Sequence, residues 1–236
     1  MKFYKLIKLC NHAFRKENEL ELNAIFVCGL KKFAYMKERK PKYTGIFFQI
    51  FLFFFRVLKE ITFFEKKKTS KPIYVFSGIS NQFDSISSTL EALKANNIEF
   101  YSFLFKSTLR KNSSSNESII VKFNLRVILV SFILFFLRAF PFYLKLKKEN
   151  KQIEISWYFS VLCRAYIFLP FFLDSLKQIN PKLIIISNDH SVYSRCLRLS
   201  AEILNIKTLY MQHACVTDFF PPLEFDYALL DGRISH

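Results

Sequence analysis

The sequence is poor in the residues that build metal sites and disulfide frameworks. Its 236 residues include 5 Cys and 4 His, and no two cysteines have the CxxC spacing. An odd number of scattered cysteines is typical of reduced thiols in a cytosolic protein. The few histidines show no clustered ligand spacing, which argues against zinc. We therefore expect no metal site and no cofactor.

A targeting segment and a long uncharged apolar run are also missing. The apolar run Ala24–Leu30 is short and follows three glutamates, unlike the apolar part of a signal peptide. The longest charge-free runs end at Arg56 or lie between Arg126 and Arg138. Both are shorter than the roughly 20 residues that cross a bilayer. We expect these runs to form interfacial or buried helices.

Positive charge and phenylalanine are in excess. The chain has 35 Lys and Arg against 19 Asp and Glu, a formal net charge of +16, and 30 Phe. There are 17 basic and 6 acidic residues through Pro72, 11 and 5 from Ile73 to Gln152, and 7 and 8 beyond. Basic residues beside bulky aromatic ones suit an anionic membrane surface, although an AT-rich genome also inflates Phe and Lys. The near-neutral last third argues against nucleic acid as a partner.

Short apolar runs alternate with stretches of helical periodicity from residue 73 onward. This alternation predicts an α/β fold, a Rossmann-like parallel sheet flanked by helices, in a domain over residues 73–236. We expect residues 1–72 to form a helical, basic region that associates with membranes. Pro141 and Pro170 are expected to kink or interrupt two long helices. The expected strands are Ile73–Phe76, Glu99–Phe105, Ile119–Phe123, Leu183–Ser187, Thr208–Gln212 and Tyr227–Leu230, and the expected helices are Tyr43–Phe64, Ser85–Asn96, Leu125–Lys148, Ile155–Gln178 and Val192–Asn205.

Polar side chains follow two of the expected strands directly. Asn188, Asp189 and His190 come after one strand, and Gln212 and His213 end the next. Ligands of open α/β sheets bind beyond the carboxyl ends of the strands, so these groups predict a site at one edge of the sheet. Asp189 and His190 are the candidate catalytic residues, because a carboxylate or an imidazole can act as a general base. The other three are candidate substrate-binding residues.

Several of these residues also have a purely structural interpretation. Asp189 is about equally well suited to cap the helix that begins near Val192. His213, taken alone, is better explained by a hydrogen bond to a neighbouring carbonyl group. Gly78 and Asn81 lie in the turn after the first strand, where backbone N–H groups can contact a phosphate or a sugar. A single glycine makes a plain tight turn the better interpretation of that segment.

The stretch ISNDHSVYSRCLRLSAEILNIKTLYMQHACV, followed by Pro221-Pro222 and DYALLDG, resembles a known family. It is similar to the end of the first Rossmann-like domain in two-domain, GT-B type glycosyltransferases of bacterial capsule and surface-polysaccharide synthesis. The resemblance covers about the last fifty residues. Ala214 stands where the family usually has glycine, so the local loop is expected to differ.

The resemblance implies an acceptor-binding half of a glycosyltransferase. Asp189, His190, Gln212 and His213 would then line a cleft between two domains, with Asp189 or His190 as base toward an acceptor hydroxyl. The partners would be a nucleotide-sugar donor bound by a second domain, a sugar or lipid-linked acceptor, and an anionic membrane surface on the cytoplasmic side. We expect residues 1–236 alone to show no transferase turnover. The alternatives are a non-catalytic α/β protein that binds a membrane or a partner, and part of a glycerophosphate transferase.

Overall fold

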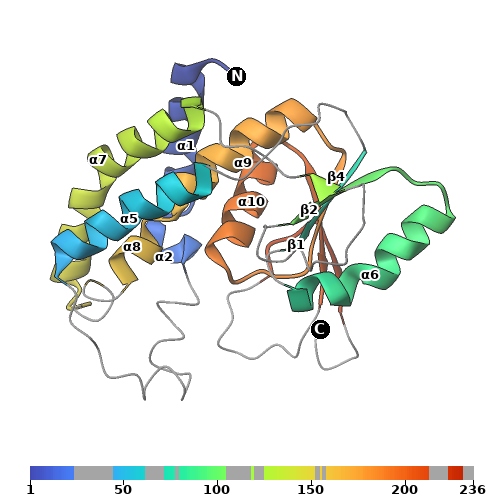
Figure 1. Ribbon diagram of the computed structural model, residues 1–236. Helices are drawn as coiled ribbons and strands as arrows, with labels where there is room; N and C mark the ends of the chain where they lie inside the picture. The colour runs from blue at the N-terminus through green and yellow to red at the C-terminus, as the bar shows by residue number, and fades with distance from the viewer. Residues whose placement is uncertain are drawn as a thin grey trace.

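Six short parallel strands form the centre of the structure (Figure 1). Their order in the sheet is β3-β2-β1-β4-β5-β6, which is typical of Rossmann-type doubly wound sheets and confirms the predicted fold class. The strands are β1 Ile73–Ser77, β2 Phe100–Leu104, β3 Ser118–Ile119, β4 Leu183–Ile186, β5 Lys207–Met211 and β6 Tyr227–Leu229.

The computed structural model describes residues 1–23, 45–61, 72–77, 80–104, 118–119, 125–151, 155, 158–212 and 223–230. The helices within these residues are α1 Phe3–Lys16, α2 Glu19–Leu22, α5 Ile46–Ile61, α6 Ser80–Ala95, α7 Leu125–Lys148, α8 Phe159–Leu162, α9 Ala165–Ile179 and α10 Val192–Ile203.

Alternating side chains of the central strands face two different helical layers. Val75 packs with Ile86 of α6 on one face of the sheet. Phe76, the next residue, lies 5.8 Å from the ring of Phe172 of α9 and 5.7 Å from that of Tyr193 of α10, on the other face. Figure 1 shows the same arrangement, with α6 on one side of the sheet and α9 and α10 on the other. Helices therefore cover both faces, as expected for a parallel sheet.

The N-terminal helices belong to the larger of these two layers. Leu6 and Cys10 of α1 and Phe53 of α5 are fully buried in the same apolar cluster as Tyr166 of α9 and Ile184 of β4. Helix α1 contacts α7, α9 and α10. The domain boundary near residue 72 stays a prediction, but the described parts of the two regions share one core.

Neither internal proline ends its helix. Helix α7 continues through Pro141 and α9 through Pro170, so a break at either residue is wrong, and a kink there stays a prediction. An internal proline costs about 3 kcal/mol. Every residue from Ala165 to Leu176 of α9 is buried, and this packing offsets the cost. The break in the segment lies instead between α8 and α9, at residues 163–164.

Two helical segments are long and apolar enough to cross a membrane, by length and composition alone. Leu125–Lys148 has a mean hydropathy of 2.2 and is 44% buried, and Phe159–Ile179 has 1.5 and is 94% buried. The second segment is a core helix of the fold, because nearly all of it packs inside the protein. The first has one face in the core and one face exposed.

Asparagine ends four of the helices. Asn97, Asn150, Asn180 and Asn205 follow α6, α7, α9 and α10, and all have φ between 50° and 55°. Glycine usually fills this left-handed position, and asparagine is the next best residue there. The chain has 4 Gly in total, which fits this use of asparagine.

The buried cysteines provide a test of this packing. Burial raises the pKa of Cys10, Cys163 and Cys196 above that of an ordinary thiol, and the thiolate is the form that alkylating reagents attack. At pH 8 we expect iodoacetamide to leave these three residues unmodified in the folded protein and to modify all of them in urea. Peptide mapping by mass spectrometry separates them from Cys28 and Cys215. Rapid modification of Cys163 in the native protein would contradict the burial of this residue at the end of α8.

Candidate functional site

The carboxyl ends of β1 and β4 form the point where the chain changes sides. The two strands pair directly, with Phe76 opposite Ile186. From β1 the chain passes to α6 on one face, and from β4 it passes to α10 on the other. In doubly wound folds, ligands bind beyond the carboxyl ends of the strands at such a switch point. The segment after Ile186 holds Asn188, Asp189 and His190, so the predicted residues lie at this switch point.

Asn188 and Ser191 organise the turn that leads into α10. The Asn188 Oδ1 atom accepts hydrogen bonds from the backbone N–H of His190 at 3.1 Å and of Ser191 at 3.0 Å. Ser191 is the N-cap residue, and its hydroxyl accepts a hydrogen bond from the Ser194 N–H at 3.3 Å. The capping role considered for Asp189 is therefore filled by Ser191. The Asp189 carboxylate stays available for another purpose.

Asp189 is a buried carboxylate with an unused oxygen. The residue is 4% exposed, and its Oδ1 atom lies 3.1 Å from His190 Nδ1. Its Oδ2 atom has no hydrogen-bond partner among the described residues. The Ser77 hydroxyl at the end of β1 is also buried and has no partner within them. A buried carboxylate oxygen without a partner is costly, so Asp189 Oδ2 is a candidate acceptor for a ligand donor.

The hydrogen bonds around His190 assign its tautomer. His190 Nε2 lies 3.1 Å from Asn188 Nδ2. The backbone N–H groups fix Asn188 Oδ1 on the other side, so its amide nitrogen faces the imidazole and donates to Nε2. The proton of a neutral His190 is then on Nδ1, where it is donated to Asp189. Since Nε2 is already engaged, Asp189 Oδ2 is the better placed atom to accept a proton from a ligand hydroxyl.

The remaining predicted site residues are placed only in part. Gln212 follows β5, where Tyr210 pairs with Ile186, so it lies at the same sheet edge as Asn188. Its backbone N–H donates to the Leu229 carbonyl at 2.9 Å. Gly78, His213 and the side chain of Asn81 lie outside the described residues, and their predicted contacts stay predictions. No group of three His, Cys, Asp or Glu side chains gathers in the described part of the chain in a way that suits a metal ion.

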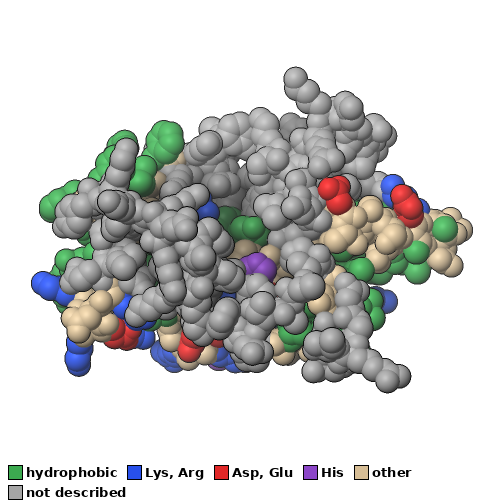
Figure 2. All heavy atoms as spheres, turned by 90° about the horizontal axis from the view of Figure 1, so that it is seen from below, with side chains coloured by type: hydrophobic (Ala, Val, Ile, Leu, Met, Phe, Trp, Pro, Cys, Tyr) green, Lys and Arg blue, Asp and Glu red, His purple; other side chains and the backbone are tan. Residues whose placement is uncertain are grey.

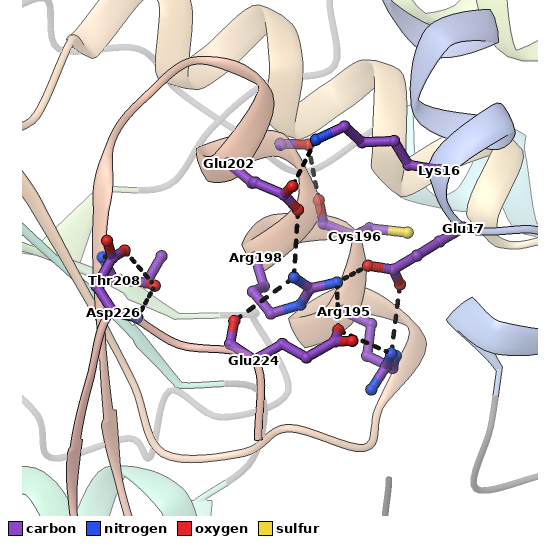
Figure 3. Close-up of polar contacts among 10 residues, drawn as sticks. Lys16, Glu17, Arg195, Cys196, Arg198, Glu202, Thr208, Glu224 and Asp226 are labelled. Carbon is purple, nitrogen blue, oxygen red and sulfur yellow. Dashed lines mark hydrogen bonds and ion pairs between the residues drawn. The ribbon is translucent and has the colours of Figure 1, made fainter. Parts of the chain in front are cut away.

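A second polar region lies at the opposite edge of the sheet. It is an open cavity of about 750 Å³ at the start of β5 and just before β6. Arg198 of α10 lines it, and Figure 3 shows Arg195 and Arg198 surrounded by Glu17, Glu202 and Glu224. Arg195 lies 3.3 Å from Glu17, and Arg198 pairs with Glu17 and lies 3.0 Å from Glu224.

The charges of this second region are paired with one another. Lys16 contacts Glu202 at 2.5 Å, and Asp226 accepts hydrogen bonds from the Thr208 N–H and hydroxyl (Figure 3). Asp226 also accepts a hydrogen bond from Lys207. The hydrogen bond from Lys207 is the main cause of the lowered pKa of Asp226. Each basic side chain that lines the cavity thus has an acidic partner. We interpret the cluster as a structural tie between α1, α10 and the segment before β6.

Sequence reasoning missed this tie. Arg195 and Arg198 are three residues apart on a helix with apolar neighbours, a signal that predicts acidic partners. Their partner Glu17 is 178 positions from Arg195 and has no local signature.

Comparisons with known proteins add no family assignment. No protein-family model matches the chain, and no curated protein matches it significantly.

Glu17 provides a test of the buried ion pairs. Replacing Glu17 with Gln leaves two arginine side chains, each only 7% exposed, without one of their carboxylates. Breaking a buried ion pair costs about 3–5 kcal/mol, so we expect a loss of this size in urea unfolding. Glu202→Gln is the matched control. The Glu202 side chain is 45% exposed, and its loss is expected to cost at most about 1 kcal/mol. Equal losses in the two variants would contradict the buried tie.

The tautomer of His190 is open to a separate test. Two-dimensional ¹H–¹⁵N NMR is expected to show His190 with its proton on Nδ1 and Nε2 unprotonated. Asn188→Asp keeps an oxygen for the backbone N–H groups but replaces the amide donor with an acceptor, so a proton should appear on Nε2. Ser191→Ala removes the helix cap without touching the ring and should leave the tautomer unchanged. A wild-type signal from protonated Nε2 would refute the assignment.

Proposed function

We propose that the protein is the acceptor-binding half of a glycosyltransferase that acts in bacterial surface-polysaccharide assembly. The observation that carries the proposal is the buried Asp189 carboxylate, whose Oδ2 atom lacks a partner in the described chain, at the switch point of a Rossmann-like sheet. A sugar hydroxyl is a neutral donor of suitable chemistry for such an oxygen. The resemblance of the stretch around Asp189 to GT-B type enzymes supports the same choice.

In the proposed reaction, Asp189 is the general base. It accepts the proton of the acceptor hydroxyl while that oxygen forms a bond to the anomeric carbon of the donor sugar, and the nucleoside diphosphate leaves with the electrons of the broken anomeric C–O bond. His190 donates to the other carboxylate oxygen and holds its orientation. The nucleotide-sugar donor is proposed to bind a second domain that closes over the candidate site.

The proposed location is the cytoplasmic face of the cell membrane, where the protein is peripheral. A lipid-linked acceptor would meet the candidate site there. The basic first two thirds of the chain support this location.

A glycerophosphate transferase is the nearest alternative. Asp189 would activate a hydroxyl in the same way, but the hydroxyl would attack phosphorus instead of an anomeric carbon. A non-catalytic protein that binds a membrane or a partner is the other alternative, and the exposed apolar faces of α5 and α7 favour it.

Acceptor binding to the chain of residues 1–236 tests the proposal. Soluble hexoses, N-acetylhexosamines and glycerol phosphate are titrated while the amide NMR signals of residues 187–190 are followed. We expect a saccharide to shift these signals. Asp189→Asn should weaken binding about tenfold or more, because a hydrogen bond to a charged acceptor is lost.

Asp226→Asn, at the opposite edge of the sheet, is the control and should leave saccharide binding unchanged. Shifts with glycerol phosphate alone would favour the alternative transferase. The acceptor role is refuted if no saccharide shifts these signals, or if Asp189→Asn binds as tightly as the wild type.

A further inference from the structure

Helices α5 and α7 lie side by side on the outside of the large helical layer (Figure 1). Their contact is aromatic: the ring of Phe53 stacks on that of Phe135 at 4.3 Å, and Phe54 lies 6.0 Å from Phe136. The inner face of α7 is buried, with Val130, Leu134 and Leu146 fully enclosed in the core. The two helices therefore hold each other in place and expose their outer faces together.

These outer faces are apolar over residues 47–55 of α5 and residues 125–144 of α7. Ten of the fifteen exposed large hydrophobic side chains of the described residues lie on the two helices. Hydrophobic side chains also gather at the left of Figure 2, the end of the molecule where α5 and α7 lie in Figure 1. We call this set the α5/α7 face: Phe47, Phe48, Phe51 and Phe55 of α5, and Leu125, Leu129, Phe136, Leu137, Phe140 and Leu144 of α7.

The positions follow the helical repeat and mark one continuous surface. Phe47, Phe51 and Phe55 are four residues apart, and the rings of Phe51 and Phe55 stack at 6.4 Å. Phe136, Phe140 and Leu144 have the same spacing on α7. A surface helix of a soluble monomer normally presents polar residues on this side. A large contiguous apolar patch instead indicates an interaction surface.

Basic residues outnumber acidic ones near the face. Helix α7 contains no Asp or Glu, and Glu60 near the end of α5 and Glu149 directly after α7 are the acidic residues beside it. Lys145, Lys147 and Lys148 are exposed in the last turns of α7, whereas Arg126 at its start is half-buried and lies 3.6 Å from the buried Asp174. Apolar rings bordered by lysines complement a bilayer surface with acidic headgroups, because the rings enter the apolar boundary while the ammonium groups contact the phosphates.

We propose that the α5/α7 face docks on a membrane leaflet rich in anionic phospholipid. The rings enter the headgroup boundary, and the lysines at the end of α7 bind lipid phosphates. The inference deepens the peripheral location proposed above, and it does not depend on the acceptor role of Asp189. Helix α7 lies on the membrane instead of crossing it, because its other face is part of the protein core.

Vesicle flotation of the chain of residues 1–236 tests this surface. The vesicles contain phosphatidylcholine alone or with a quarter of phosphatidylglycerol. We expect binding only to the second kind, and weaker binding as salt rises. Phe51→Glu combined with Phe140→Glu replaces side chains that are 61% and 67% exposed, so the fold should survive. This variant should lower the partition coefficient at least about tenfold.

Two further variants make the test specific. Ile98→Glu is the matched control, since it makes the same change at a residue that is 42% exposed in the turn before β2, and it should bind as the wild type does. Combined Lys145→Gln, Lys147→Gln and Lys148→Gln should weaken binding by about fivefold per lysine. The Asp189→Asn variant should bind the vesicles as the wild type does. The flotation assay therefore tests this surface separately from the acceptor role of Asp189.

Several outcomes would overturn the proposal. Equal binding to both kinds of vesicle would refute the role of anionic lipid. Unchanged binding of the double glutamate variant would refute the role of the α5/α7 face. Resistance to extraction by alkaline carbonate would mean that the chain spans the bilayer. Absence of vesicle binding, together with a dimer that the double glutamate variant dissociates, would assign the face to a second copy of the chain.

Discussion

Pairing between β1 and β4 is the constraint on which the rest of the molecule depends. Ile73 pairs with Leu183, more than a hundred residues away in the sequence, and this contact forms the middle of the sheet. The chain leaves the two strands on opposite faces, so one pairing determines which helices cover each side. The same pairing brings Ser77 and Asp189 to one edge. The position of the candidate site thus follows from the strand order of the sheet.

Much of the sheet was predictable because its signals are local. The strands around Ile73 and Leu183 are short β-branched or aromatic runs bounded by turn residues, and the helix from Val192 follows a cluster of capping residues. The continuation of α9 through Pro170 was not predictable, since only the packing of both sides of the helix outweighs a proline. The tie between Glu17 and the α10 arginines was hidden for a similar reason, because it joins segments that meet only in the folded chain.

The candidate site was located from the sequence, but its internal roles were not. Asn188, Asp189 and His190 were all expected near a ligand. The structure distinguishes them: Asn188 Oδ1 is engaged by the turn, His190 is held between its two neighbours, and one oxygen of Asp189 lacks a partner among the described residues. The direction of each hydrogen bond distinguishes the roles of these three residues. The presence of polar residues after a strand in the sequence does not reveal that direction.

The asparagines that end four helices have a consequence for the unfolded chain. An asparagine at a left-handed position strains the native backbone more than glycine does, by about 1 kcal/mol. It also leaves the unfolded chain fewer conformations, an entropic effect worth about 0.4–1 kcal/mol in favour of folding. The two effects act in opposite directions. A chain this poor in glycine therefore has a denatured ensemble that is narrower at Asn97, Asn150, Asn180 and Asn205 than that of a glycine-capped protein.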